Sequence, residues 1–394
     1  MSRVVAPSPR ATAPPRVLLA ITESHPGGAQ EVVLALLEEL PRLGIVPGLA
    51  CGGQGVVLQR ARELGLATFP LPHMLRPLRP GADLAAASEL RAAVQQFHPD
   101  LLHAHSFKAG LLARLLGERL ELPTVFTVHG WSVYHRLGPP LNAVYMALER
   151  RLSRHATSVY VCGADQAVAQ RWGLPRGVLI PNGVRDRGVR RESPLPPQAP
   201  LELLTVARLS AAKAPLRTIR LLGELRRRHP TLDWRLTWVG AGPAEDRTRR
   251  ELARQGLENR VRLVGDQADV APYYRTAHAF LLLSRYEGSP LAVIEAMQAR
   301  LLVLATAVGG VPELLEHGRA GVLLDPKASL KQLAHRLAGI LSTPEGWERM
   351  RERAGNLGDR HSARAMAEAY ATAYRKVLAE KAPPSGAPAA AAPD

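Results

Sequence analysis

Two glutamates separated by seven residues, Glu287 and Glu295, are the side chains whose type and spacing most clearly indicate chemistry. They enclose the segment Gly288-Ser289-Pro290-Leu291. A carboxylate accepts paired hydrogen bonds from a vicinal diol, so one glutamate could hold a ribose and the other a sugar ring. The segment follows an apolar run at 280–283 and opens a helical pattern, which adds backbone N–H donors. A pair of surface glutamates is the alternative that spacing alone leaves open.

Two cations, Arg208 and Lys213, follow the apolar run 201–206. Arginine offers a planar fork and lysine a point charge, so the two could clamp a diphosphate. After the next apolar run, Gly240 and Gly242 form a turn whose backbone can line a nucleotide. A solvated basic loop is the alternative for the two cations.

Near the start of the chain, Gly27 and Gly28 lie between an apolar run and a helical pattern. Two glycines allow close approach of a ligand, and a helix N-terminus attracts an anion. The loop lacks the full G-x-G-x-x-G fingerprint, which disfavours a nicotinamide cofactor. A plain tight turn carries about equal weight.

Three histidines, His103, His105 and His129, are placed at the ends of buried strands. Histidines two apart share one face of an extended strand, a spacing that could suit a metal. No cysteine or carboxylate nearby in the sequence completes a ligand set, so a metal is not expected. A role in a binding site is favoured over purely structural histidines, and most clearly for His129, because Gly130 leaves space beside it.

Around these residues, short apolar strands alternate with amphipathic helices, although periodicity assigns no element to residues 41–83. Such alternation predicts two α/β domains, each a doubly wound parallel sheet, with the active site in a cleft between them at the carboxyl ends of the strands. The expected organisation is a flexible N-terminus at 1–15, a domain at 16–186, a proline-rich linker at 187–200, a domain at 201–362, a helix at 363–380 and a disordered tail at 381–394.

The 394 residues carry 51 Lys+Arg against 35 Asp+Glu, a formal charge of +16. Only six of the cations are lysine and 45 are arginine, which indicates compositional bias as much as nucleic-acid binding. With two cysteines, neither a disulfide framework nor a four-cysteine zinc site is possible. No apolar stretch reaches the ~20 residues of a membrane span, and no secretory signal is evident. A cytoplasmic protein is expected.

Two further motifs complete the pattern, Ile180-Pro181-Asn182-Gly183-Val184 and Gly309-Gly310-Val311-Pro312-Glu313. In their order and spacing, all these motifs resemble the retaining glycosyltransferases of family 4. The resemblance runs from Arg16 to about Glu380 and implies the GT-B fold, in which two Rossmann-like domains face a central cleft and a C-terminal helix returns to the first domain.

The resemblance also implies roles for the residues. Glu295 would hold the ribose, Arg208 and Lys213 the diphosphate, and Glu287 with the backbone of Gly288–Leu291 the donor sugar. His129 would lie beside that sugar and Gly28 near the phosphates, while His103, His105 and Asn182 are acceptor-side candidates. The leaving diphosphate would help to deprotonate the acceptor. No D-x-D motif is present, so the resemblance implies neither a metal nor a cofactor beyond the nucleotide sugar.

The expected partners are therefore a nucleotide sugar and a carbohydrate or lipid-linked acceptor, in cell-surface polysaccharide or glycolipid synthesis, without nucleic acid. A helical stripe of apolar residues with three arginines beside it, at 141–154, predicts either a core-packed helix or contact with an anionic membrane at its inner face. A GT-B epimerase or phosphorylase, or a non-enzymatic basic scaffold, are the alternative functions.

Overall fold

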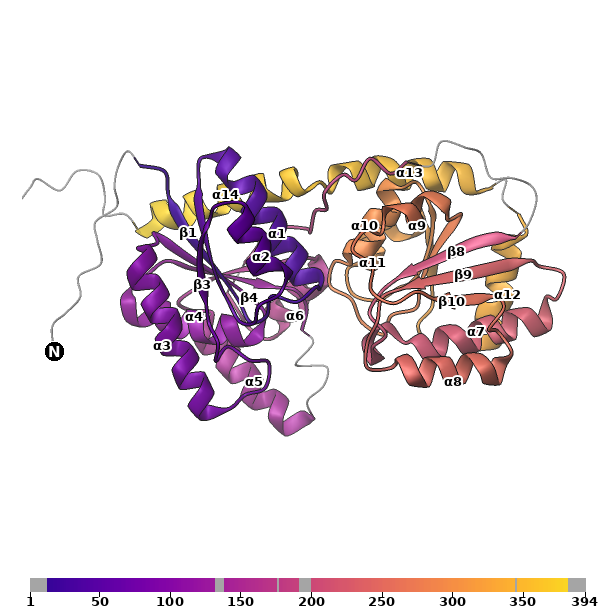
Figure 1. Ribbon diagram of the computed structural model, residues 1–394, viewed down its shortest axis with the longest axis horizontal. Helices are drawn as coiled ribbons and strands as arrows, with labels where there is room; N and C mark the ends of the chain where they lie inside the picture. The colour runs from indigo at the N-terminus through magenta and orange to yellow at the C-terminus, as the bar shows by residue number, and fades with distance from the viewer. Residues whose placement is uncertain (1–12, 132–137, 176, 191–199, 344–345, 382–394) are drawn as a thin grey trace, which may run out of the picture. The chain divides into compact units, whose positions relative to one another are not determined.

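Two compact units make up the chain in the computed structural model, which describes residues 13–131, 138–175, 177–190, 200–343 and 346–381 (Figure 1). The first unit contains Met1–Tyr160, Gln166–Ile180 and Met366–Asp394, and the second contains Val161–Asp165 and Pro181–Ala365. Each unit is built around its own parallel sheet. The predicted fold class, two doubly wound α/β domains, is confirmed.

The first sheet has the strand order β3-β2-β1-β4-β5-β6-β7, and all its paired strands are parallel. Its strands are β1 (Arg16–Ile21), β2 (Val46–Cys51), β3 (Ala67–Pro70), β4 (Leu101–His105), β5 (Thr124–Val128), β6 (Thr157–Tyr160) and β7 (Val178–Leu179). The helices among them are α1 (Gly28–Glu39), α2 (Val56–Glu63), α3 (Pro80–Phe97), α4 (Phe107–Leu120), α5 (Pro139–Leu152) and α6 (Gly163–Arg171), with a 3-10 turn η1 (Leu40–Leu43).

Strand β4 shows why the first sheet forms as it does. Its residues Leu101–His105 are all buried, and alternate side chains point to opposite faces. Leu102 and Ala104 pack in the hydrophobic cluster beside α3 and α4. His103 therefore points to the other face, where α14 (Ala363–Lys381) supplies the Tyr374 hydroxyl that contacts it.

The second sheet has the order β10-β9-β8-β11-β12-β13 and is also parallel throughout. Its strands are β8 (Leu201–Val206), β9 (Trp234–Val239), β10 (Val261–Leu263), β11 (Ala279–Leu282), β12 (Leu302–Thr306) and β13 (Val322–Leu324). The helices are α7 (Pro215–Arg228), α8 (Glu245–Gln255), α9 (Ala271–Thr276), α10 (Leu291–Gln298), α11 (Val311–Leu314), α12 (Leu330–Leu341) and α13 (Trp347–Arg360), with 3-10 turns η3 (Ala211–Lys213) and η4 (Glu316–Gly318).

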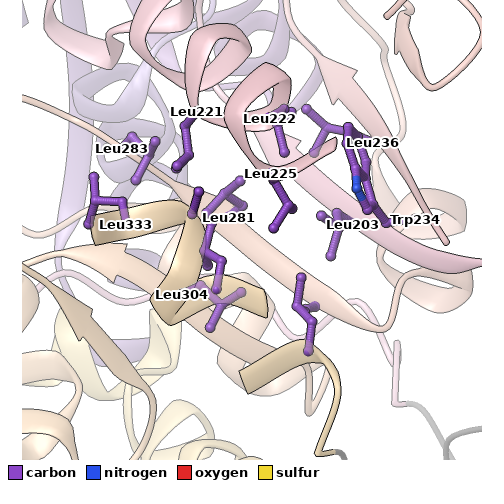
Figure 2. Packing of buried hydrophobic residues seen from close by; sticks show 14 of the residues in the cluster. Leu203, Leu221, Leu222, Leu225, Trp234, Leu236, Leu281, Leu283, Leu304 and Leu333 are labelled. Carbon is purple, nitrogen blue, oxygen red and sulfur yellow. The ribbon is translucent and has the colours of Figure 1, made fainter. Parts of the chain in front are cut away.

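Both faces of the second sheet are buried, each under its own layer of helices (Figure 1). Leu281 and Leu283 point toward α7, α8 and α12, where Leu222, Leu225 and Leu333 meet them (Figure 2). Phe280 and Leu282 point the opposite way, into the cluster with Tyr274 of α9 and Val293 of α10. This explains the continuous apolar runs of the sequence, because a strand covered on both faces has no polar side.

Residues 41–83, to which periodicity assigns no element, contain β2, α2 and β3. Strand β2 includes Pro47 and Gly48, residue types that normally argue against a central strand. Gly48 is required here because a Cβ would lie 2.8 Å from the Phe97 ring. Packing against a residue distant in the sequence therefore stabilises a strand that local propensity disfavours.

The first residues of the predicted linker are packed in the structure, whereas the sequence predicts a free connection. Val189 is buried in a core cluster of the second unit, and Arg187 lies 3.5 Å from Glu295. Residues 187–190 therefore pack on the second unit instead of forming a free connection. The flexible N-terminus predicted at 1–15, most of the linker and the disordered tail predicted at 381–394 fall largely outside the described residues.

A buried ion pair offers a test of the first unit's packing. Arg114 of α4 and Glu149 of α5 are each 1% exposed, joined by two hydrogen bonds of 2.7 and 3.1 Å. Replacing Glu149 with alanine leaves a buried, unpaired guanidinium, so we expect Glu149→Ala to lower the free energy of unfolding by about 3–5 kcal/mol.

The matched control is Glu118→Ala, since Glu118 pairs with Arg151, whose side chain is 57% exposed. We expect a loss below about 1 kcal/mol for this exposed pair. Urea unfolding followed by circular dichroism measures both variants, and equal losses would contradict the account.

Candidate active site

The order of the second sheet creates a reversal between β8 and β11, and most of the predicted donor-binding residues follow these two strands. In open parallel sheets, ligands bind beyond the carboxyl ends of the strands at such a reversal. The backbone N–H of Arg285, after β11, donates to the carbonyl of Ala212, after β8, at 2.8 Å. The two loops are therefore joined through their backbones.

Lys213 and Glu287, predicted from separate motifs, meet in this region. The Lys213 ammonium donates to Oε1 of Glu287 at 2.5 Å, and the Ser284 hydroxyl donates to the same oxygen at 2.5 Å. The Glu287 side chain is only 7% exposed, while that of Lys213 is 27% exposed. Lys213 is thus the more exposed member of the pair, and Glu287 is buried and fixed by two hydrogen bonds. No sequence motif points to Ser284, whose contact with Glu287 depends on the folded loop.

Glycines hold the loop after β11 against the loop after β12. A Cβ on Gly309 would lie 1.6 Å from the carbonyl oxygen of Glu287, and one on Gly310 would lie 2.3 Å from that of Gly288. The N–H of Gly310 donates to the Gly288 carbonyl at 2.9 Å. The Gly309-Gly310 motif therefore sets the backbone of the segment that follows Glu287.

The glycine turn after β9 packs in the same manner against the loop after β8. A Cβ on Gly240 would lie 2.3 Å from the carbonyl oxygen of Ala207, and one on Gly242 would lie 2.6 Å from that of Leu209. Between these contacts lies Arg208, whose side chain is exposed and makes no hydrogen bond or ion pair within the described part of the chain. The structure thus brings Arg208 beside the Gly240 turn but not into the Lys213–Glu287 pair.

Asn182, predicted as an acceptor-side residue, lies in the second unit. Its side-chain amide donates to the carbonyl of Ser289 at 2.8 Å, and the residue is 5% exposed. Ser289 and Pro290 are also buried, while Leu291 begins α10. Asn182, an acceptor-side candidate, therefore contacts the segment that the sequence predicts to bind the donor sugar.

Glu295 of α10 is held by groups that the sequence did not single out. The buried Tyr274 hydroxyl donates to its Oε2 at 2.9 Å, and Arg187 lies 3.5 Å from its Oε1. Burial, followed by the Glu295 charge, raises the pKa of Tyr274 well above its usual value, so the phenol stays a donor. Arg187, Tyr274, Glu295 and Gln298 line a small pocket.

In the first unit, Gly27 and Gly28 lie where β1 leads into α1. Gly27 precedes the helix, Gly28 is its first residue, and a Cβ on Gly27 would lie 2.6 Å from the side-chain oxygen of Gln30. Gln30 is buried and donates to the carbonyl of Glu23 at 3.1 Å, which folds the loop back on itself. The exposed Gly28 leaves the helix N-terminus open to an anion.

The three predicted histidines gather at the carboxyl ends of β4 and β5. His105 and His129 share a hydrogen bond of 2.9 Å between Nδ1 and Nε2, and the rings of His103 and His105 are 4.1 Å apart. Burial lowers the pKa of His129 to about 4 and, with the nearby His129, that of His103 to about 3. Burial, with both neighbours, places the pKa of His105 well below its ordinary value. All three are neutral at pH 7.

Two tyrosines of α14, which the sequence did not single out, complete this histidine cluster. The Tyr374 hydroxyl lies 2.6 Å from Nδ1 of His103, and Nε2 of His103 lies 2.8 Å from the Thr127 hydroxyl. Tyr370 contacts that same hydroxyl at 2.9 Å. Among the described residues, no group of three or more His, Cys, Asp or Glu side chains is placed to hold a metal ion.

The predicted stripe on α5 divides between core and surface. Tyr145 is 8% and Leu152 1% exposed, as the core interpretation requires, whereas Leu141 is 58% and Val144 67% exposed. Two other exposed leucines, Leu78 and Leu84, flank the N-terminus of α3. Within the described ranges, no helix combines the length and hydropathy that crossing a bilayer requires.

In comparisons with known proteins, each half of the chain matches a family of glycosyltransferases. Residues 26–187 match the family described as Glycosyltransferase Family 4, and residues 186–357 match Glycosyl transferases group 1. The chain is 28% identical over 264 residues to glycogen synthase of Mycobacterium tuberculosis (strain ATCC 25618 / H37Rv), covering 65% of this chain and 63% of that one, less than two thirds of its length. It is 30% identical over 313 residues to D-inositol 3-phosphate glycosyltransferase 2 of Catenulispora acidiphila, covering 71% of this chain and 72% of that one.

Solved structures resemble the fold over nearly the whole chain. Sucrose-phosphate synthase from Thermosynechococcus elongatus superposes with a TM-score of 0.79 at 20% identity, over 93% of this chain and all of that one. Anabaena Alr3699/HepE in complex with UDP-glucose superposes with a TM-score of 0.75 at 19% identity, over 92% of this chain and 99% of that one. The sequence matches and the two doubly wound sheets together establish that this chain is a glycosyltransferase of family 4, group 1, with the GT-B fold.

Proposed function

We propose that the protein is a retaining, metal-independent glycosyltransferase that moves a sugar from a nucleoside-diphosphate sugar to a carbohydrate or lipid-linked acceptor. The observation that carries this proposal is the Lys213–Glu287 pair beside the glycine-lined loops that follow β8, β9 and β11. A cation for phosphate and a carboxylate for sugar hydroxyls occupy adjoining positions at one sheet edge. UDP-glucose bound to the HepE relative supports the same donor class.

In the proposed reaction, a bond forms between the acceptor hydroxyl oxygen and the anomeric carbon while the bond from that carbon to the diphosphate breaks. The acceptor proton passes to a leaving phosphate oxygen on the same face of the sugar. Negative charge develops on the diphosphate, so the protein's main task is to neutralise it and to orient two substrates. Lys213 and Arg208 supply the neutralising cations, and the scheme needs no cofactor beyond the donor.

Glu295 is proposed to accept the hydrogen bonds of the ribose diol. Tyr274 restrains its Oε2 and Arg187 lies near its Oε1, so the carboxylate is held in one orientation. On donor binding, Arg187 would yield its place to a ribose hydroxyl. The same arrangement could serve a GT-B epimerase or phosphorylase, which a product assay with an added carbohydrate acceptor separates from a transferase.

The donor nucleotide can be identified by thermal shift. A panel of UDP-, GDP- and ADP-sugars is added to the full chain, because only a ligand that binds the native state stabilises it. We expect one nucleotide class to raise the melting temperature in a concentration-dependent manner, and no stabilisation by any member would count against the proposal.

Removing a clamp residue tests the site itself. We expect Glu295→Gln to weaken donor binding about ten- to a hundredfold, because a charge-assisted hydrogen bond contributes about 1.5–3 kcal/mol. We expect Lys213→Ala to reduce turnover more than affinity, because charge on the diphosphate grows in the transition state. Calorimetry gives the first change and initial rates give the second.

Matched controls are Glu245→Gln and Lys331→Ala, at exposed or half-exposed positions on α8 and α12. Both should bind donor and turn over like the unmodified protein. If Glu295→Gln and Lys213→Ala behave like these controls, the proposed donor site is wrong.

For the acceptor, we propose a lipid-linked carbohydrate reached at the cytoplasmic face of an anionic membrane. The exposed Leu78, Leu84, Leu141 and Val144 support this proposal. Leu78 and Leu84 lie around the start of α3, and Leu141 and Val144 lie on α5. Both places are close to the N-terminus of α4, because Lys108 contacts Asp83 of α3 and Phe107 packs on Tyr145 of α5. Exposed cations near them, including Arg76 and Arg79, suit anionic headgroups. The first unit would bind the acceptor.

Vesicle sedimentation tests the membrane proposal. The protein should bind vesicles containing anionic lipid at low salt and lose most binding at high salt, as expected for partly electrostatic attachment. The double change Leu141→Asp with Val144→Asp should reduce binding at least tenfold, because two apolar side chains no longer enter the interface.

The control is Leu64→Asp, at a leucine 36% exposed just after α2. It should leave vesicle binding unchanged. Absence of binding to anionic vesicles at low salt would end the membrane proposal while leaving the donor site untouched.

A further inference from the structure

The hydrogen bond between His105 and His129 carries information about where a proton lies. Both rings are neutral at pH 7, because burial depresses their pKa values. A neutral imidazole has one N–H donor and one acceptor nitrogen. In the 2.9 Å contact between Nδ1 of His105 and Nε2 of His129, one nitrogen must therefore carry hydrogen and the other a lone pair.

The second nitrogen of His105 distinguishes the two arrangements. His105 is fully buried, and among the described residues its Nε2 has no hydrogen-bond partner. If His129 donated, His105 would have to carry its proton on this Nε2, as a buried N–H without an acceptor. If His105 donates, Nε2 is merely an unused lone pair. An orphaned buried donor costs more than an under-used acceptor, so the second arrangement is favoured.

We infer that His105 is a positioning residue that donates from Nδ1 to Nε2 of His129 and so holds His129 in its Nδ1–H tautomer. His129 then presents an N–H donor at its remaining nitrogen, which makes no hydrogen bond within the described chain. The hydrogen bond on one ring nitrogen sets the proton on the other.

The residues around His105 hold its ring in the observed orientation. His103 packs against its ring at 4.1 Å, and both nitrogens of His103 are engaged, one by Tyr374 and one by Thr127. Thr127 is held in turn by Tyr370. This satisfied network offers no further acceptor to His105, and it fixes the wall against which His105 stands.

The functional consequence rests on the proposed glycosyl transfer. As a permanent N–H donor, His129 would hydrogen-bond an oxygen of a bound substrate, and it would not act as the base that deprotonates the acceptor. The proton of the acceptor hydroxyl is then taken up by the leaving phosphate instead of by His129. His129 is only partly buried by accessible surface, which leaves part of the residue accessible to such an oxygen.

The tautomer can be measured without any activity. Long-range proton–nitrogen correlation spectra of the full chain labelled with ¹⁵N-histidine, at pH 7.5, distinguish a protonated from an unprotonated ring nitrogen. We expect a protonated Nδ1 and an unprotonated Nε2 for His129, identified by the signals lost in His129→Gln. A protonated Nε2 on His129 would overturn the inference, whatever the enzyme's activity.

Two variants test whether His105 is the cause. His105→Phe keeps a planar ring but removes the donor, and should release His129 from the Nδ1–H tautomer and lower turnover about tenfold, as expected for one lost orienting hydrogen bond. His105→Asn restores an amide donor near the original Nδ1 and should recover the tautomer. Unchanged His129 signals in His105→Phe would refute the role of His105.

Tyr374→Phe is the matched control, because it deletes a hydroxyl from the same buried cluster without touching the His105–His129 bond. It should lower stability and leave the His129 signals in place. A shift of the His129 tautomer in this variant equal to that in His105→Phe would show general disruption of the cluster and overturn the inference. The expected tautomer in a protein that binds no sugar nucleotide would contradict only the proposed function.

Discussion

The close backbone contact between the loops that follow β11 and β12 is the constraint on which the proposed donor site depends. Gly309 and Gly310 lie so near the carbonyls of Glu287 and Gly288 that no side chain fits. This contact sets the path of the segment between Glu287 and α10, and thereby the position of its N–H groups. The sheet supplies the frame, since two fully buried faces leave its strands little freedom to shift. Loops on such a frame can carry a precisely oriented clamp.

Each glutamate of the candidate site lies next to a cation of opposite charge. Lys213 neutralises Glu287, Arg187 lies beside Glu295, and each carboxylate also accepts a hydroxyl hydrogen bond, from Ser284 and Tyr274 respectively. A sugar nucleotide would exchange these cations from carboxylate to phosphate and supply its own hydroxyls to the glutamates. The histidine cluster of the first unit carries no charge, because burial keeps its three rings neutral and their polar contacts are hydrogen bonds.

Local spacing made the fold class, the Glu287–Glu295 element and the glycine turns predictable, because each depends on residues close in the chain. The supporting groups were not predictable in this way. Tyr274 lies 21 residues before its partner Glu295, and Tyr374 lies 271 residues after His103. The hydrophobic periodicity of the sequence gives no sign of such pairs, because they form only when the helices pack in the folded chain. Likewise β2, with its proline and glycine, forms because Phe97 packs on Gly48, and Asn182 reaches Ser289 only through the folded second unit.

Amide hydrogen exchange with nucleoside diphosphates determines whether the donor binds at the carboxyl ends of β8 and β11. The full chain is compared alone and with saturating UDP, GDP or ADP, and peptides are followed by mass spectrometry. We expect the nucleotide that binds to slow exchange in the segments 208–214 and 288–295, which contain the proposed contacts, with little change in α12, which carries none of the proposed site residues. Protection confined to other segments, or none with any of the three nucleotides, would contradict it.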